Sequence, residues 1–282
     1  MRVALLTAAA LTGFAANSLL TRSALGGGWL DAPSFTIIRL VTGALTLALL
    51  LRITPGQSGG TKIRGSWSAG AALAGYAIAF TVAYTRIGAA VGALLLFGAV
   101  QATMIGVGLA RGERLGARDW VALALAAAGL GWLTVPGASA PNALGAALMI
   151  GAGACWGIYS LAGRGSRHPL ADTSANFWRA ALLCALALGA LVSPAGFTWH
   201  GALLATASGA LASGVGYTLW YMALPHLAAW RAALLQMTVP VITAIAASVL
   251  LAEVITPRLL GSAVLVTAGV ALSIRWAQRR RF

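Results

Sequence analysis

The sequence predicts an all-α integral membrane protein of about ten transmembrane helices. Apolar residues make up 60% of the 282 residues and charged residues only 9%, and the mean hydropathy is +0.87. Soluble globular domains do not reach these values, so a water-soluble fold is excluded. The apolar residues also fall in long runs, and a run of about 20 residues is the length of helix that crosses the hydrocarbon core of a bilayer.

Ten such runs can be marked along the chain. The first five lie near residues 3–21, 33–52, 66–86, 88–110 and 117–135. The second five lie near residues 143–163, 171–192, 201–222, 227–251 and 257–276. Short segments with proline, glycine and charged residues separate the runs, as expected of loops that leave the membrane. The beginning of the chain imitates a signal peptide without a convincing cleavage site, so we expect the first run to be a mature helix.

The positive charges indicate how these spans are oriented. If the N-terminus is cytoplasmic, thirteen of the nineteen Lys and Arg residues fall in cytoplasmic segments, three fall outside and three lie within spans. The positive-inside rule therefore predicts a multi-pass protein of the bacterial inner membrane with both termini in the cytoplasm. Because the charges stand singly between apolar runs and form no basic face, the net charge of +14 does not indicate nucleic-acid binding.

An internal repeat relates the two halves of the chain. A shift of 140 residues places Arg39 on Arg179 and Glu113 on Glu253, each at an equivalent position among the spans. Two matched charges alone would be weak, but the first and sixth spans also share a glycine position, and the segments after the fourth and ninth spans correspond. The sequence thus predicts a duplication.

The two copies, residues 1–140 and 141–282, are predicted to have opposite orientations in the membrane. Each copy contains five spans, and an odd number makes the second copy enter from the other side. Inverted repeats of this kind build two symmetry-related gates around a central site, which then opens to each side in turn. The pattern predicts alternating-access transport, and a duplicated helical scaffold without transport is the alternative.

Three short motifs carry a resemblance to a known family: ArgGlyGluArg at 111–114, LeuLeuAlaGlu at 250–253 and GlnMetThrValProVal at 236–241. Together with the five-plus-five duplication, they make the whole chain resemble the drug/metabolite transporter (DMT) superfamily, EamA type. The compact loops and aromatic-rich helices look most like the bacterial aromatic amino acid exporter branch, the YddG-like proteins. The resemblance implies a basket-like bundle whose central cavity is lined mainly by helices one, three, four, six, eight and nine.

Aromatic side chains are the main candidates for lining such a cavity. Tyr76, Phe80 and Tyr84 recur at every fourth position of the third span and therefore share one helix face. Ring faces with a few hydroxyl groups would suit an aromatic or amphipathic solute. An interfacial belt or simple helix packing would also explain any single ring. The expected substrate-binding rings are Tyr76, Phe80, Tyr84, Trp156, Tyr159, Tyr217, Trp220 and Tyr221.

Three side-chain amides within the spans are expected to bind the same solute. Asn17, Gln101 and Gln236 stand out because an unpaired amide in hydrocarbon is costly and each needs a partner. Pro240 cannot donate to the carbonyl of Gln236, so a main-chain acceptor is freed beside that amide. The kink expected at Pro240 could bind the solute, or it could be structural, with water bonded to the free carbonyl group. Since Val100 occupies the matching position in the first half, only the second half could use a proline gate.

Four charged residues are expected to have gating or structural roles. Arg39 and Arg179 lie inside the second and seventh spans at matching positions, where they would brace helix ends or extend to the interface. Glu113 and Glu253 stand at span ends near basic residues, which favours the same role. The functional alternative is that one of the two arginines binds a substrate carboxylate through two parallel hydrogen bonds.

The absence of certain residues narrows the function further. No ionisable group suited to a proton cycle lies at mid-membrane depth, and no phosphate-binding loop is present, so we expect uncoupled, gradient-following movement. No motif indicates catalysis, a metal site or a cofactor, and neither an intramembrane enzyme nor a channel is favoured. The expected partners are the lipid bilayer and a small solute, with a homodimer as an open option.

The leading prediction is therefore a facilitated exporter of aromatic or other amphipathic amino acids and similar metabolites. A drug or nucleoside carrier of the same superfamily is the nearest alternative. Nucleotide sugars and phosphorylated metabolites would require several basic groups in the cavity, and the spans contain few arginines and no lysine.

Overall fold

The computed structural model describes residues 2–54, 65–110, 117–134, 140–163, 166–193, 196–223, 226–227, 235–236 and 238–279. These residues are almost entirely helical, and no strand occurs among them. The helices of the first half are α1 (Arg2–Gly26), α2 (Ala32–Ile53), α3 (Trp67–Tyr84), α4 (Ala89–Ala110) and α5 (Ala117–Thr134). Those of the second half are α6 (Ala143–Ala162), α7 (Pro169–Leu188), η1 (Gly189–Leu191), α8 (Trp199–Ala207), η3 (Ser208–Val215), α9 (Gly216–Ala223), α11 (Thr238–Leu250) and α12 (Pro257–Arg279).

Each of the ten predicted spans overlaps a described helix. The eighth span consists of α8, η3 and α9, which follow one another without a break, and η3 is a π-helical segment of 8 residues. Of the described segments, seven are long and apolar enough to cross a membrane. The crossing of all ten spans and their inverted relationship stay predictions.

Polar residues in the loops fix where several helices begin. The side chains of four N-cap residues accept a hydrogen bond from a backbone N–H of the first helical turn, which would otherwise lack a partner. Short polar loops therefore end the apolar runs at defined points. The four capping residues are Asp31 before α2, Ser66 before α3, Asn142 before α6 and Thr198 before α8.

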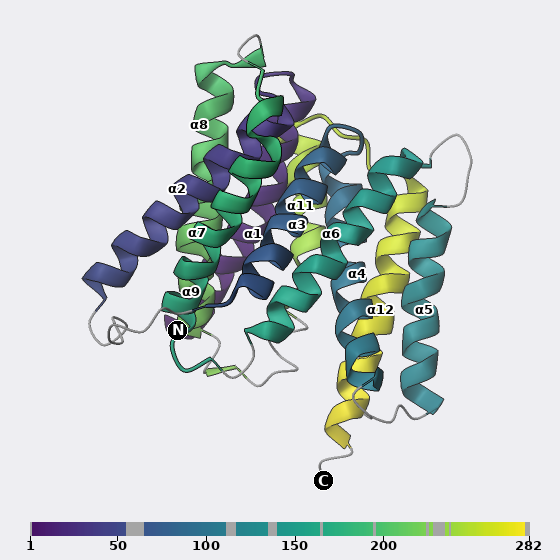
Figure 1. Ribbon diagram of the computed structural model, residues 1–282. Coiled ribbons are helices and arrows are strands. Elements are labelled where there is room, and N and C mark those ends of the chain that lie inside the picture. Colours follow the sequence, from purple (N-terminus) through teal and green to yellow (C-terminus); the bar gives the residue numbers. More distant parts are fainter. Residues whose placement is uncertain are drawn as a thin grey trace.

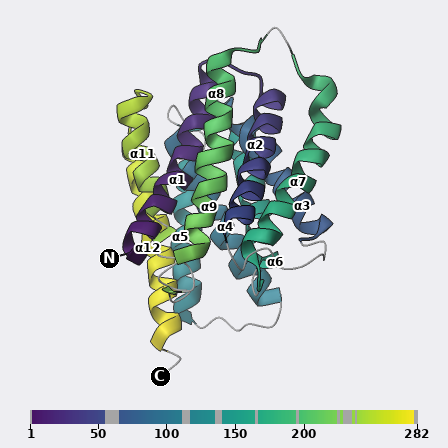
Figure 2. The ribbon, with the colours of Figure 1, turned by 90° about the vertical axis from the view of Figure 1, so that its left-hand side faces the viewer.

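The helices pack as one bundle in which the two halves interleave (Figure 1). Helix α6 lies between α3 and α4, and α1 packs against η3, α9 and α11. Helix α2 contacts α7 and η3, whereas α5 and α12 lie side by side at one edge, as Figures 1 and 2 both show. The central helices of both halves therefore surround a common space.

Glycines allow the closest of these contacts. A Cβ on Gly209 of η3 would overlap the carbonyl of Arg39 and the hydroxyl of Thr42 on α2. On α6, a Cβ on Gly153 would lie 2.6 Å from the carbonyl oxygen of Leu96, on α4. Backbones approach this closely in membrane bundles where a side chain is missing, so these glycines serve helix packing.

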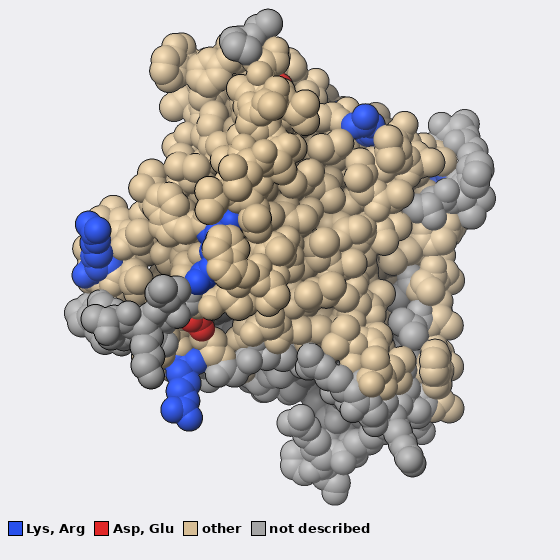
Figure 3. All heavy atoms as spheres, viewed as in Figure 1, with Lys and Arg blue, Asp and Glu red and all other residues tan. Residues whose placement is uncertain are grey.

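The outer faces of the bundle are apolar. Figure 3 shows a broad face almost free of charged atoms, with the few Lys and Arg scattered singly over it. Large apolar side chains such as Leu186, Trp199 and Val249 are 75–79% exposed. An apolar surface of this extent is stable against lipid and not against water.

One end of the bundle is held together by a charged cluster. The guanidinium Nε of Arg22 on α1 lies 3.3 Å from Oε1 of Glu253, in the connection between α11 and α12. Glu253 also accepts the N–H groups of Ala89 and Ala90 at the start of α4, at 2.8 and 3.3 Å. Because Arg22 donates in addition to the carbonyl of Tyr84 at the end of α3, four segments meet in one network, which we call the closed end.

Candidate functional site

A cavity of about 610 Å³ lies between the two halves. Its walls come from α1, α3, α4, α6, α7 and α9, together with Leu227 and Gln236. This set includes the helices that the resemblance implied and adds the seventh. Both halves of the chain thus contribute to one central chamber of a size suited to a small organic molecule.

The cavity reaches the surface at the end of the bundle opposite the closed end. Its rim includes Gly65 and Ser66 before α3 and the exposed residues Ala162 and Gly163 at the end of α6. Tyr84 in the closed end terminates α3, a helix of 18 residues, so about 27 Å separates the two ends. Among the described residues, the rim of the chamber therefore lies at the end of the bundle away from the closed end.

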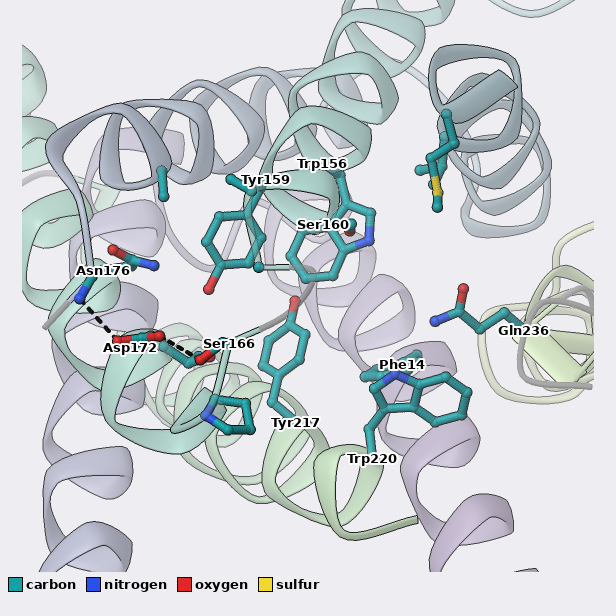
Figure 4. Close-up of a pocket in the computed structure, with 18 of the residues that line it drawn as sticks. Phe14, Trp156, Tyr159, Ser160, Ser166, Asp172, Asn176, Tyr217, Trp220 and Gln236 are labelled. Carbon is teal, nitrogen blue, oxygen red and sulfur yellow. Dashed lines mark hydrogen bonds between the residues drawn. The ribbon is translucent and has the colours of Figure 1, made fainter. Parts of the chain in front are cut away.

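Polar groups on α7 hold the rim in place. Asp172 accepts hydrogen bonds from the backbone N–H of Gly65, at 3.1 Å, and from the hydroxyl of Ser166 (Figure 4). One helical turn further, Asn176 accepts from the N–H of Ser66 at 2.9 Å. These bonds tie the segment before α3 to the first turns of α7, and they occupy carboxylate and amide oxygens that face the cavity.

Trp156 is the centre of the aromatic wall. The centroid of its ring system lies 4.9 Å from that of Tyr76, 5.4 Å from Tyr159 and 5.2 Å from Tyr217. On the other side, Phe14 lies 5.6 Å from Tyr217. Tilted ring pairs at these distances stabilise one another, so α1, α3, α6 and α9 present a single connected surface of rings.

A small second cavity continues the main one inward, toward the closed end. It has a volume of about 30 Å³ and shares Phe14, Trp156, Tyr217 and Gln236 with the main cavity. The polar residues that line the small cavity but not the main one come from α1, α3 and η3. These polar residues are Asn17, Ser18, Tyr76 and Ser213.

The hydroxyl of Tyr76 is the centre of a buried polar network beside the small cavity. Its oxygen accepts a hydrogen bond from Arg39 Nη2 at 3.0 Å and one from Asn17 Nδ2 at 3.3 Å. Ser208 donates in turn to Asn17 Oδ1 at 2.6 Å. The network links α1, α2, α3 and η3, and Arg39 is 1% exposed within it.

Most of the rings and amides singled out in the sequence meet at these two cavities. The main cavity contains Gln101, Trp156, Tyr159, Tyr217, Trp220 and Gln236, and the small one adds Asn17, Tyr76 and Phe80. Tyr84 lines neither. It lies one turn beyond Phe80, where its ring packs at 4.7 Å from the Phe80 ring and its hydroxyl points to the Ala89 carbonyl. The side chain of Tyr221 lies outside the described residues.

The residues predicted to have gating or structural roles lie in different parts of the structure. Arg39 is buried and does not extend to the interface, whereas the guanidinium of Arg179 lies 5.6 Å from the centroid of Trp67. Glu253 belongs to the closed end, and Glu113 lies outside the described residues. Pro240 lies in α11, where its side chain is buried.

The sequence analysis missed several residues of the site. Phe14 lines both cavities, and Asp172 and Asn176 form the rim on α7. Phe14 precedes Asn17 by three positions and so shares its helix face, which was a usable signal. Asp172 and Asn176 are four positions apart at the start of an apolar span, which also places two polar side chains on one face.

Apolar outer faces around a central chamber are typical of a multi-pass membrane transporter. Residues 143–275 match the EamA-like transporter family. An uncharacterised protein of Pseudomonas aeruginosa is 48% identical over 271 residues, which cover 96% of this chain and 94% of the relative. The second half of the chain therefore matches an EamA-like transporter domain, and this match supports a membrane transporter.

Two further comparisons agree with this assignment. The threonine/homoserine exporter RhtA of Escherichia coli K12 is 32% identical over 167 residues, 56% of this chain and 56% of the exporter. A solved crystal structure superposes with a TM-score of 0.70 over 97% of both chains at 17% sequence identity, which shows a shared fold.

Proposed function

We propose that this protein is an alternating-access exporter of aromatic or other amphipathic amino acids. It would span a bacterial inner membrane ten times, with residues 1–140 and 141–282 as inverted repeats and both termini in the cytoplasm. The observation that carries the proposal is the ring-lined chamber, built by both halves, which opens at one end and is closed at the other by Arg22 and Glu253. A carrier caught facing one side has this asymmetry.

The helix contacts support the inverted repeat. Exchanging the halves pairs α1 with α6, α2 with α7, α3 with α8 to α9, α4 with α11 and α5 with α12. Under this exchange the contact of α3 with α6 becomes that of α9 with α1, and the contact of α4 with α6 becomes that of α11 with α1. Both members of each pair occur, and the contacts α2 with α7 and α5 with α12 map onto themselves.

The chemistry of the chamber favours an amphipathic amino acid. Trp156, Tyr217 and Trp220 offer flat apolar surfaces, while Gln236 and Gln101 supply amides that can donate and accept (Figure 4). The family relative RhtA is by name an amino acid exporter, although its name gives threonine and homoserine as the solutes. The branch of aromatic amino acid exporters accounts better for the ring wall.

The positive-inside rule assigns the open mouth to the cytoplasm. The mouth lies at the start of α3 and the end of α6, beside the segments that contain most of the Lys and Arg residues. The closed end would then face outward. An export cycle starts from this state, because a solute from the cytoplasm can enter the chamber before the opposite side opens.

The described lining of the chamber contains no group that is suited to carry a proton through the transport cycle. Asp172 is the one acidic residue in the lining of the main cavity as described, and both of its oxygens accept hydrogen bonds at the rim. A carboxylate that carries protons through the cycle would be expected deeper in the membrane. We therefore propose uniport down the solute gradient.

Counterflow in proteoliposomes tests the function. Purified protein is reconstituted, the vesicles are loaded with unlabelled phenylalanine, tryptophan, threonine, homoserine, uridine or a cationic drug, and uptake of the same labelled compound is followed. A carrier shows saturable uptake that the trans solute accelerates. Acceleration by the amino acids supports the proposal, and acceleration only by uridine or the drug would establish the alternative nucleoside or drug carrier.

A further inference from the structure

We propose that the small cavity at the inner end of the chamber is a carboxylate subsite, with Arg39 as its positive charge and the Tyr76 hydroxyl as its donor. The inference rests on the proposed function and deepens it, because it specifies which end of the substrate enters first. The solute's acid group would lie in the small cavity, and its side chain would stay among the rings of the main chamber.

Arg39 is a buried cation without an anionic partner. Among the charged side chains that the structure describes, it alone is buried, with 1% exposure. No carboxylate of a described residue lies within ion-pair distance of it, and its Nε and Nη1 atoms have no hydrogen-bond acceptor there. A guanidinium removed from water normally has its charge and its N–H groups satisfied, so this site lacks a negative group.

Two aromatic rings hold the guanidinium in position. Its central carbon lies 5.2 Å from the ring centroid of Tyr76 and 4.9 Å from that of Phe80. Contacts of this kind stabilise a desolvated cation without neutralising it. Phe80 and Tyr76 also line the small cavity, so the positive charge lies directly behind its wall.

The hydroxyl of Tyr76 connects Arg39 to the cavity through hydrogen bonds. Its oxygen already accepts N–H groups from Arg39 and Asn17, which occupies both of its lone pairs. Its hydrogen is used in neither bond and is left to donate to a third group. A hydroxyl that accepts from a cation is a stronger donor, because hydrogen bonds in a chain polarise one another.

A second donor faces the same space from η3. Ser213 is 1% exposed, lines the small cavity, and has no hydrogen-bond partner for its Oγ among the described residues. The described lining therefore contains the hydroxyl groups of Tyr76, Ser213 and Ser18 and no carboxylate, and the positive charge of Arg39 lies behind it. This lining fits an anion or another strong acceptor.

The volume decides how much of a solute can enter. About 30 Å³ is enough for one or two water molecules, so it fits an end group and not a whole amino acid. The shared residues Trp156, Tyr217 and Gln236 connect this space to the main cavity. An amino acid would therefore bind with its carboxylate inward and its side chain toward the mouth.

Pairs of acids and amides test the subsite. Counterflow is measured with L-phenylalanine against L-phenylalaninamide, and with L-threonine against L-threoninamide, which differ only at the acid group. The wild type should prefer each acid by about tenfold or more, since a hydrogen bond to a charged group is worth that factor. Tyr76→Phe should reduce the preference severalfold, and Arg39→Gln should abolish it.

A structural role for the two residues predicts a different result. Loss of packing would lower acid and amide transport equally and leave their ratio unchanged. Tyr76→Phe keeps the ring and is the milder variant if Arg39→Gln does not fold. Arg179→Gln, which changes the matching arginine of the other copy, should keep the wild-type ratio.

Three outcomes would overturn the subsite. The first is a wild type that transports acid and amide equally well. The second is that the Tyr76 and Arg39 variants keep the wild-type ratio of acid to amide transport. The third is amino acid transport that depends on chloride while this ratio stays unchanged, which would place an inorganic anion in the cavity. If the wild type transports no amino acid at all, the proposed function itself fails.

Discussion

Arg22 and Glu253, which are 231 positions apart, form an ion pair that joins the first span to the connection before the last one. The carboxylate is shared between the guanidinium and the first N–H groups of α4. Because α1 and α4 both line the chamber, releasing this one contact would free two of its walls. In the proposed orientation, the outer side would therefore open at this pair.

Glu253→Gln should favour the state that is open at this end. The amide keeps one acceptor for α4 but loses the charge that attracts Arg22 and the positive end of the helix. With the native Cys155 and Cys184 replaced by alanine and a cysteine placed at Ser18, an impermeant thiol reagent on the outer side should react about fivefold faster or more. Right-side-out vesicles provide the measurement.

The control for that experiment removes a carboxylate elsewhere. Asp31→Asn alters the N-cap of α2, where the carboxylate accepts from the N–H of Ser34 at 2.9 Å, without touching α4. It should leave the labelling rate unchanged. Equal rates in wild type and Glu253→Gln would show that the pair does not hold the outer side closed.

Trp156→Ala should impair transport strongly while the protein still folds. The ring packs against Tyr76, Tyr159 and Tyr217 at the centre of the chamber wall, so its removal should weaken solute binding and lower the counterflow rate about tenfold or more. Size-exclusion chromatography in detergent checks the fold. Trp178→Ala, which removes a ring that is 45% exposed on α7, should transport normally.

Gln236→Ala tests the amide that both cavities share. The side chain is half-buried and lies across the chamber from Trp156, so truncation should lower the apparent affinity for the solute more than the maximal rate. Concentration dependence of counterflow separates the two quantities. A wild-type curve would remove Gln236 from the site.

Collapse of the proton gradient should leave transport of a zwitterionic amino acid intact. Asp172 is the one acidic residue in the described lining of the main cavity, and its carboxylate accepts hydrogen bonds at the rim. Uptake is compared with and without a protonophore at equal solute gradients, in wild type and in Asp172→Asn. Complete arrest by the protonophore would establish proton coupling and contradict uniport.

Gly209→Ala should destabilise the protein by about 1–3 kcal/mol, as overpacking does. The added methyl would meet the Arg39 carbonyl and the Thr42 hydroxyl, which are parts of α2 that cannot move away cheaply. Thermal unfolding in detergent measures the change. Gly151→Ala is the matched control, since a Cβ there has open space within 4 Å, and a drop of the same size would indicate a general effect of helix glycines.

The sequence could predict the helices because apolar length is an unambiguous signal in a membrane protein. It could also predict that Tyr76 and Phe80 share a face, since that depends only on their spacing. It could not predict that Tyr84 falls outside both cavities, because the stripe continues beyond the point where the chamber ends. In a helix that is apolar all round, periodicity does not distinguish the chamber from the lipid.

The position of Arg39 shows a second limit. Its match with Arg179 suggested equal roles, but the structure gives them different surroundings: Arg39 meets Tyr76 and Phe80, whereas Arg179 lies over Trp67. A repeat preserves backbone positions, and the neighbours of a side chain depend on the residues that the other helices contribute. Those neighbours become visible only when the helices are assembled.

The π-helical turns of η3 determine which way the rings that follow them point. Each residue of an ordinary helix turns the chain by about 100°, whereas a π-helical turn accommodates an additional residue before the hydrogen bond closes. Deleting a single residue such as Ala210 would restore ordinary winding and rotate everything downstream by about one residue step. Tyr217 and Trp220 would then point away from Phe14. The chamber would lose one wall although none of its lining residues had been replaced.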